Sequence, residues 1–369
     1  MPPPVIPDHV LLRSIGSGAY GEVWLAHNVM GTPRAVKVIW RRQFQSARPF
    51  EREFAGIQRY EPVSRSSGGL VHMLHVGRND AEGFLYYVME LADDAAAPPD
   101  AASDSWSDDP AALRQHSGAP APHGLASYSP RTVRSDLKRL GRLSTAHCLR
   151  LAIDVASGLA QLHRHGLIHR DVKPGNIIYV NGRAKLADIG LVTADGEGRT
   201  FVGTEGYIPP EGPGSPAADL YALGVVLYEA STGFPPERLP DVPPEWFTSP
   251  VGDAALELHE VILKACEGQR ERRYPNAEAL QADLALLQSG QSVRHARALQ
   301  RRYARLRLSG IAGTTLLVLA LVAAFFANYR ARLAGESRAR EATLRQQAQQ
   351  TQAHAESAEH EARRQLQAG

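Results

Sequence analysis

The stretch "LIHRDVKPGNII", from Leu167 to Ile178, decides the fold of this chain. Its polar residues are closely spaced: Lys173 comes two positions after Asp171, and Asn176 comes five positions after it. A carboxylate, an ammonium group and an amide therefore lie within one short segment between apolar residues. Such a set of side chains predicts a site of chemistry, and the flanking sequence must say which chemistry it is.

Further polar motifs follow this segment along the chain. Asp188 lies twelve residues beyond Asn176, in "KLADIGLV" (Lys185–Val192), between an apolar run and a glycine. Such an aspartate can hold a magnesium ion over a nucleotide, or it can simply stabilise a turn. Beyond it lie "GTEGYIPPE" (Gly203–Glu211), "DLYALG" (Asp219–Gly224) and Arg273.

A glycine-rich motif lies near the start of the chain, in "IGSGAYGEV". Its glycines are Gly16, Gly18 and Gly21, and Val23 follows them. Glycine lets a backbone come close to phosphates, but a dinucleotide-binding turn shares this spacing and continues into a helix. Here the β-prone "EVWLAHN" follows, and then a second strand, "RAVKVIW". A strand, a glycine loop and a strand predict a β-hairpin over the phosphates.

Lys37 lies inside that second strand, between apolar neighbours, where it could hold the α- and β-phosphates of a nucleotide. Such a lysine needs an anionic partner to fix its position. The helix-prone "FEREFAGIQRY" offers Glu51 and Glu53. Glu53 fits better, because Phe54 and Ile57 predict a buried helix face around it, whereas Glu51 reads as part of a solvated face.

Taken together, these motifs resemble those of the eukaryotic-like serine/threonine protein kinases of the bacterial membrane-receptor type. The resemblance runs from about Val10 to Gln288, with every motif in order. It implies an α+β fold with two lobes: a small, mainly β N-lobe and a larger, mainly α C-lobe. Two positions depart from the family pattern: Ile189 replaces the aromatic residue after Asp188, and Pro210 replaces an alanine. Neither departure removes a charged group.

The resemblance also implies a catalytic role for individual residues. Phosphoryl transfer depends mainly on positioning and charge neutralisation. Asp171 would accept or orient the proton of the substrate hydroxyl, Thr204 would support that aspartate, and Lys173 would neutralise the transferring phosphoryl group. Asn176 and Asp188 would hold Mg²⁺, with Mn²⁺ as an alternative.

For the nucleotide, the resemblance implies ATP and a set of contacts from both lobes. Lys37, braced by Glu53, would hold the phosphates beneath the glycine loop. The expected contacts to adenine are Val23 and Ala35 as the roof, Ile178 as the floor, Met89 as the gatekeeper, and the backbone of Glu90 and Ala92 as the edge.

By the same resemblance, three further residues match positions that have a structural role in the family, and one matches a regulatory position. Arg273 would pair with Glu211, and Asp219 would be buried beneath the catalytic loop. Thr200 is the preferred autophosphorylation site, with Arg170 as the residue that could receive its phosphate. The alternative is that this short segment holds itself in place without a phosphate.

Other functions remain open at this point. A membrane-bound pseudokinase scaffold would carry a damaged catalytic set, whereas this set is intact. A small-molecule phosphotransferase would usually lack "GTEGYIPPE", which forms a platform for peptide substrates. Lys173 fits serine/threonine rather than tyrosine specificity. We therefore expect a protein serine/threonine kinase that also phosphorylates itself.

Composition divides the chain into segments and limits its partners. The net charge of +2 gives no reason to expect nucleic acid, and only two cysteines exclude a disulfide framework. The Ala-, Pro- and Asp-rich stretch after the adenine contacts predicts a flexible insert. The expected segments are a kinase domain over 8–290 (N-lobe 8–92, insert 93–130, C-lobe 131–290), a basic segment 291–307, a transmembrane helix 308–327 and a polar helical tail 328–369.

The transmembrane prediction rests on "LSGIAGTTLLVLALVAAFFA", from Leu308 to Ala327, which contains no charged residue. Twenty helical residues span about 30 Å, the thickness of a bilayer core. The alternative, a buried core helix, lacks a second apolar segment to pack against. The start of the chain does not read as a signal peptide, so we expect a single-pass protein of the cytoplasmic membrane with its kinase domain in the cytoplasm. The expected partners are protein substrates, the lipid bilayer and a second copy of the chain, which the alanine-rich tail would hold only weakly.

Overall fold

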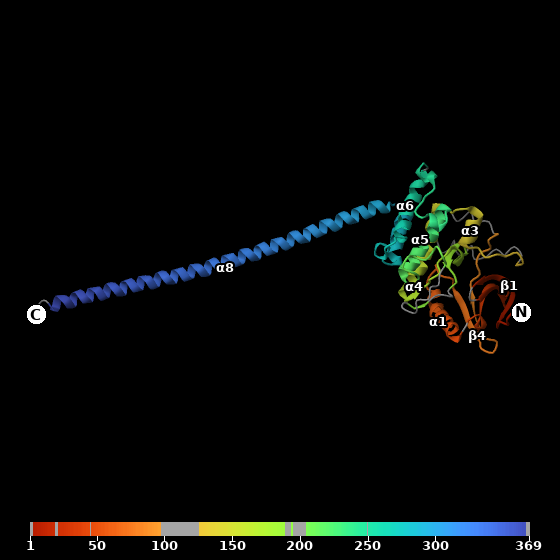
Figure 1. The fold of residues 1–369 in the computed structure, drawn as a ribbon, viewed down its shortest axis with the longest axis horizontal. Coiled ribbons are helices and arrows are strands. Elements are labelled where there is room, and N and C mark those ends of the chain that lie inside the picture. Colours follow the sequence, from red (N-terminus) through yellow and green to blue (C-terminus); the bar gives the residue numbers. More distant parts are fainter. Residues whose placement is uncertain are drawn as a thin grey trace. The chain divides into compact units, whose positions relative to one another are not determined.

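The computed structural model describes residues 3–18, 21–44, 46–96, 125–188, 193–194, 204–248 and 250–366. The chain divides into two compact units, Met1–Arg294 and His295–Gly369. Figure 1 colours the chain by residue number and labels several of its elements, among them β1, β4, α1 and α8. The first unit carries a β-sheet followed by a set of helices, and the second consists of most of one long helix.

The sheet near the N-terminus has five strands in the order β1-β2-β3-β5-β4, and every neighbouring pair is antiparallel. Its strands are β1 (His9–Gly18), β2 (Gly21–Asn28), β3 (Pro33–Trp40), β4 (Met73–Asn79) and β5 (Phe84–Met89). β1 and β2 form the hairpin that the sequence predicts, with Gly18 opposite Gly21. This antiparallel hairpin excludes the dinucleotide-binding alternative, in which the glycine loop leads into a helix.

Both faces of the central strands are buried, because side chains alternate between the faces of a strand. In β5, Leu85 and Tyr87 join the main core, whereas Phe84 and Tyr86 join a smaller core on the opposite face. The single long helix of this region, α1 (Ala47–Ser64), packs on the main-core side and buries its apolar stripe there. The N-terminal part therefore has the predicted composition of strands with one helix.

Helices dominate the part that follows. They are α3 (Val133–Leu140), α4 (Thr145–Arg164), α5 (Pro216–Thr232), α6 (Pro250–Ala265) and α7 (Ala277–Gln288). Serine or asparagine side chains cap the start of α4, α5 and α7 by accepting a backbone hydrogen bond. The short strands are β6 (Leu167–Ile168), β7 (Ile177–Val180), β8 (Arg183–Leu186) and β9 (Thr193–Ala194). This sheet-plus-helices arrangement is the two-lobed α+β fold that the sequence predicts.

The two ends of the predicted insert are paired with each other. Asp94 and Pro130 form an antiparallel bridge, and the amide of Ala95 donates to the carbonyl oxygen of Ser129 over 2.8 Å. The carboxylate of Asp94 also accepts from the amide of Ser129 at 3.2 Å. We call residues 93–96 and 125–132 the insert stem. The prediction of a flexible segment over 93–130 did not include these contacts at its two ends, and residues 97–124 lie outside the described residues.

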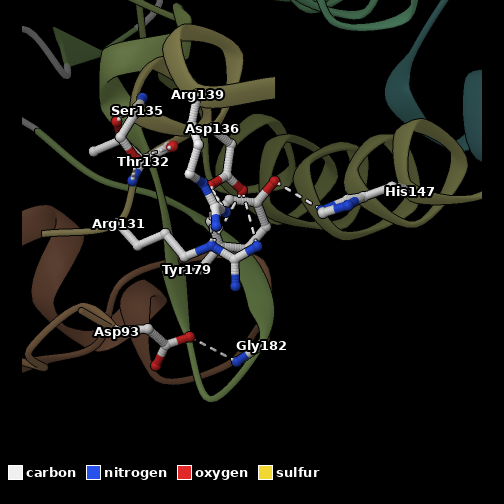
Figure 2. Close-up of polar contacts among 9 residues, drawn as sticks. All are labelled: Asp93, Arg131, Thr132, Ser135, Asp136, Arg139, His147, Tyr179 and Gly182. Carbon is white, nitrogen blue, oxygen red and sulfur yellow. Dashed lines mark hydrogen bonds and ion pairs between the residues drawn. The ribbon is translucent and has the colours of Figure 1, made fainter. Parts of the chain in front are cut away.

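The insert stem is fixed to the hairpin of β7 and β8. The carboxylate of Asp93 accepts hydrogen bonds of 2.8 Å from the backbone amides of Asn181 and Gly182, in the turn between the two strands. Figure 2 shows the contact to Gly182. The acidic residues of the insert suggested a solvated loop. These carboxylates instead accept hydrogen bonds from backbone amides of turns, and composition alone does not reveal such contacts.

A buried ion pair holds the other side of the stem. The guanidinium of Arg131 lies 2.9 Å from Asp136 of α3, whose side chain is 1% exposed, and 4.5 Å from the ring centroid of Tyr179. Arg139 contacts the same carboxylate at 3.0 Å, and the hydroxyl of Tyr179 lies 3.0 Å from Nε2 of His147 in α4 (Figure 2). The stem is thereby joined to α3, α4 and β7.

The second unit consists of most of α8 (Val293–Leu366). Within the residues described, one stretch, Thr314–Ser357, is long and apolar enough by length and composition to cross a membrane. None of its most apolar window is buried, and exposed side chains such as Leu317, Val318 and Phe325 lie in it. The segment is thus a candidate transmembrane span, in agreement with the apolar stretch found in the sequence.

Candidate active site

The carboxylate of Asp171 is the centre of a cluster of polar side chains. The hydroxyl of Thr204 donates to its Oδ1 at 2.8 Å, and the amide of Asn176 donates to its Oδ2 and its main-chain oxygen, each at 2.8 Å. The ammonium group of Lys173 lies 2.7 Å from Oδ2 and donates to the Thr204 hydroxyl at 3.0 Å. Asp171 is therefore fixed in orientation by residues on both sides of the loop.

The backbone of this loop is fixed from below by Asp219 of α5, which is 1% exposed. Its carboxylate accepts from the amide of His169 at 2.9 Å and from that of Arg170 at 2.8 Å, while Nε2 of His163 lies 2.9 Å away. Burial opposes the charge of Asp219, but the contacts with His163 and His169 together outweigh it and keep the pKa of the carboxyl below its usual value. Arg170 has a φ of 69°, so the loop has a left-handed turn at the residue before Asp171.

Lys37 of β3 and Asp188 form a direct ion pair across the two lobes. Burial opposes both charges. In the case of Lys37, the interactions with Tyr87 and Asp188 outweigh burial and raise the pKa of the ammonium group above its usual value. For Asp188, the charge and hydrogen bond of Lys37 act together with the charges of His169 and Lys173, outweigh burial and lower the pKa of the carboxyl. Asp188 has a φ of 59°, which points to a backbone held by its surroundings.

Glu53 of α1 does not make the ion pair with Lys37 that the sequence predicts. Among the described residues, the ammonium group of Lys37 contacts Asp188 instead, and Oε1 of Glu53 is buried without a hydrogen-bond partner. Glu53 still lies close enough to interact electrostatically with Lys37. Burial is the larger effect and raises the pKa of Glu53 to about 8. Because Asp188 competes for the same cation, the sequence could not show which acid makes the contact.

The glycine loop leads from β1 into β2, and Ala19 and Tyr20 at its tip lie outside the described residues. Gly21 is required for packing, because a Cβ atom there would collide with the carbonyl oxygen of Val38 in β3. At Gly18, by contrast, a Cβ atom would meet nothing within 4 Å. The two glycines therefore serve different purposes, which the motif alone does not distinguish.

The residues expected around adenine lie on or next to strands of both lobes. Ala35 of β3 pairs with Met89 at the end of β5, and Val23 of β2 pairs with Lys37. Ile178 lies in β7, where it forms a bridge with Thr132 of the insert stem. Within the described residues, the carbonyl oxygen of Glu90 and the amide of Ala92 make no hydrogen bond.

Two of the remaining predicted residues lie together. The guanidinium of Arg273 is 3% exposed and holds Glu211 through two hydrogen bonds, one of them 2.8 Å long. Burial opposes the charge of Glu211, but Arg273 outweighs it and lowers the pKa of the carboxyl. Thr200 and Ile189 fall outside the residues that the structure describes.

The donor set fits a magnesium ion. Mg²⁺ prefers oxygen ligands and is usually held by one or two carboxylates together with substrate phosphates and water. Asn176 and Asp188 offer an amide oxygen and a carboxylate, and the amide of Ala187, next to Asp188, donates to the carbonyl oxygen of Asn176 at 2.8 Å. Within the described residues no group of three or more His, Cys, Asp or Glu side chains could hold a metal on its own.

Comparison with known families identifies this part of the chain. Residues 128–243 match the family model of the protein kinase domain. The chain contains a protein kinase domain. The matched region includes Asp171, Asn176, Asp188 and Asp219, whereas β1 to β5 and α1 precede it and α6 and α7 follow it.

Known relatives of this kinase domain are bacterial serine/threonine-protein kinases. The chain is 34% identical to serine/threonine-protein kinase PknA of Mycobacterium tuberculosis over 236 residues, which are 60% of this chain and 46% of the relative. It is 30% identical to a probable serine/threonine-protein kinase of Corynebacterium efficiens over 324 residues, 80% of this chain and 43% of the relative. It is 33% identical to serine/threonine-protein kinase PknB of Mycolicibacterium smegmatis over 186 residues, 44% of this chain and 29% of the relative. The chain thus matches less than half the length of each of these relatives.

The kinase domain also contains polar contacts that sequence reasoning missed. His163 holds Asp219, and Lys185 holds Glu90 at 2.7 Å. A signal for Lys185 was present, since it is a lysine in an apolar run three positions before Asp188. For His163 the helical pattern of α4 gave no indication, because its partner lies far away in sequence.

Proposed function

We propose that this chain transfers the γ-phosphoryl group of ATP to serine or threonine hydroxyls of proteins. The observation that carries this proposal is the position of Asp171, whose carboxylate is held by Thr204 and Asn176 beside the ammonium group of Lys173. A carboxylate with a fixed orientation beside a cation is what transfer to a hydroxyl requires, because this reaction depends on positioning and charge neutralisation. The serine/threonine kinases among its relatives support the same reaction.

At the reacting centre, Asp171 orients the substrate hydroxyl and takes its proton as the oxygen attacks phosphorus. Lys173 lies 2.7 Å from Asp171, so its charge is close to the same centre and can neutralise the phosphoryl oxygens. Thr204 connects the two side chains through its hydroxyl. The position of Lys173, two residues after Asp171, favours serine and threonine as acceptors.

The nucleotide binds between the lobes. The glycine loop covers its phosphates, and Lys37 holds the α- and β-phosphates. Glu53 lies close enough to Lys37 to interact with it electrostatically. Val23 and Ala35 cover adenine, Ile178 supports it, Met89 limits the pocket, and the backbone of Glu90 and Ala92 binds its edge. Asn176 and Asp188 hold Mg²⁺, which supplies positive charge to the phosphates.

Three finer proposals follow from the sequence. The kinase phosphorylates itself at Thr200, in the segment between Asp188 and Glu211. Residues 308–327 anchor it in the cytoplasmic membrane, with the kinase domain on the ATP-containing side and residues 328–369 outside. A second copy of the chain is a partner through the tail. Protease treatment of intact spheroplasts tests the topology, and digestion of the kinase domain rather than the tail would contradict it.

The central test is an assay of radiolabelled phosphate transfer. The purified chain is incubated with Mg²⁺, ATP and either protein or small-molecule acceptors. Label on serine or threonine of a protein, the chain itself included, is the expected result. Nucleotide binding without transfer to any acceptor would favour a pseudokinase scaffold. Label on small molecules alone would favour a small-molecule phosphotransferase.

A further inference from the structure

Lys185 is a buried cation in the strand that leads to Asp188. It is 6% exposed, and its ammonium group lies 2.7 Å from Oε2 and 3.0 Å from Oε1 of Glu90. Glu90 itself is mostly buried, with 21% of its side chain exposed. Removing two charges from water in this way costs free energy, which the ion pair repays only when the geometry is good. Two neutral side chains would avoid this desolvation cost. The ion pair of Lys185 and Glu90 therefore points to a requirement that these two residues be held in a fixed geometry.

A third segment joins this ion pair. The backbone amide of His72 donates to Oε2 of Glu90 at 2.9 Å, and Nδ1 of the same histidine lies 3.4 Å from Oε1. In the opposite direction, the amide of Glu90 donates to the carbonyl oxygen of His72 at 3.3 Å. Glu90 is therefore held through both its side chain and its backbone. We call Glu90, Lys185 and His72 the hinge cluster.

The hinge cluster involves the amide and the carboxylate of Glu90 but not its carbonyl oxygen. Its amide and carboxylate are used within the cluster, whereas its carbonyl oxygen and the amide of Ala92 make no hydrogen bond within the described residues. Those two groups are the ones proposed to bind the edge of adenine. A ligand bound by backbone groups requires that the backbone be held in place before binding.

The same cluster is connected to the metal aspartate. Beyond Lys185, the amide of Leu186 donates to the carbonyl oxygen of Gly69 at 2.9 Å, and the carbonyl oxygen of Leu186 accepts from Val71 at 3.0 Å. The next amide, that of Ala187, donates to Asn176, and Asp188 follows. Lys185 lies in β8, the strand that leads to Asp188. Its side chain holds Glu90, which lies two positions before Ala92.

We propose that the ion pair between Glu90 and Lys185, together with His72, positions the adenine-binding backbone and sets the preference of the site for adenine. These are positioning residues, because their side chains act through the backbone of residues 90–92 and do not contact the reacting atoms. The proposal rests on the proposed kinase function. It adds residues of the chain that determine which base the site accepts.

The test uses the full chain in detergent with the variants Glu90→Gln, Lys185→Met and the double variant. Each variant is measured for kcat and KM with ATP and with GTP, and for binding of each nucleotide. We expect each single variant to raise the KM for ATP about tenfold, with kcat within about twofold and a ratio of GTP to ATP affinity closer to one. Glu278→Gln, which breaks an exposed pair with Arg164 far from the hinge, is the matched control and should change neither value.

The double variant separates positioning from stability. It leaves no uncompensated charge, so it should be at least as stable to heat as either single variant, yet its KM for ATP should remain raised. Wild-type values of KM and base preference in folded single variants would overturn the proposal. So would unfolding of all three variants, because the cluster would then serve stability alone. A wild-type chain that binds no nucleotide would instead contradict the proposed function itself.

Discussion

The hydroxyl of Thr204 donates a hydrogen bond to Oδ1 of Asp171 over 2.8 Å, and the same hydroxyl accepts one from Lys173 over 3.0 Å. One hydroxyl thus sets the distance between the proposed base and the proposed phosphate-binding cation. Thr204 lies 33 residues beyond Asp171, at the start of the segment that ends in Glu211. The placement of this segment and the geometry of the reacting centre are therefore coupled.

From this contact we predict the effect of Thr204→Val. The variant keeps the shape of the side chain but loses the hydroxyl, so Asp171 and Lys173 lose their common partner. We expect kcat to fall about tenfold or more with little change in the KM for ATP. Thr204→Ser keeps the hydroxyl and should retain most of the activity. Equal loss in both variants would mean that the methyl group, rather than the hydrogen bonds, matters.

A second prediction concerns Asp171. Asp171→Asn keeps the size of the side chain but cannot accept a proton. We expect kcat to fall on the order of a hundredfold or more, with nucleotide binding and thermal stability close to wild type. The measurement is steady-state transfer to a protein substrate, together with titration of ATP binding. Unchanged kcat would remove Asp171 from the role of base.

The third prediction uses the pH dependence of Glu53, whose pKa burial raises to about 8 from an ordinary value of 4.5. Between about pH 4.5 and pH 8 the folded chain holds a proton that the unfolded chain releases, so this group makes the fold less stable as pH rises. Glu53→Gln stays neutral and lacks this dependence. We expect its free energy of unfolding to exceed that of wild type at pH 8.5 by at least about 1 kcal/mol, and the difference to shrink towards pH 5. Urea unfolding at several pH values measures it, and a difference that grows towards low pH would contradict the expected sign.

A fourth prediction compares two glycines of the phosphate loop. In Gly21→Ala the new Cβ atom collides with the carbonyl oxygen of Val38, whereas in Gly18→Ala it meets nothing within 4 Å. We expect the first variant to lose about 1 to 3 kcal/mol of stability, as overpacked sites typically do, and the second to unfold like wild type. Thermal unfolding in the absence of nucleotide tests this. Equal stability of the two variants would show that the strands adjust without cost.

The fifth prediction concerns the buried carboxylate of α3 that holds the insert stem. Asp136 is 1% exposed and contacts both Arg131 and Arg139. In Asp136→Asn the buried guanidinium of Arg131 loses its counter-charge, so we expect a loss of about 3 kcal/mol in the free energy of unfolding. Asp241→Asn, which removes an exposed partner of Arg238 at 3.4 Å, is the control and should cost less than about 1 kcal/mol. Similar small losses in both would mean that the buried pair adds little to stability.

Local patterns in the sequence predicted most of the fold and most of the cluster around Asp171. The catalytic loop could be read directly because Asp171, Lys173 and Asn176 lie close together in sequence and hold one another. The partner of Lys37 could not be read in the same way. Glu53 and Asp188 are both plausible acids, and the choice depends on burial and distance in three dimensions.

The hinge cluster and the insert stem lay beyond the reach of sequence patterns for a related reason. Lys185 and Glu90 are 95 positions apart, and nothing in either neighbourhood identifies the other. In the stem, Asp93 and Asp94 read as part of an acidic, solvated stretch. Their carboxylates instead accept hydrogen bonds from backbone amides, some of them in a turn 88 and 89 residues away.

The closed stem also makes residues 97–124 a tolerant position for changes in chain length. Since the bridge between Asp94 and Pro130 already brings both ends together, the residues between them need to span almost no distance. The entropic cost of a longer loop grows slowly, by about 0.6 kcal/mol for each doubling of its length. A fluorescent or affinity module inserted between the two ends of the stem should therefore leave the contacts of the stem in place.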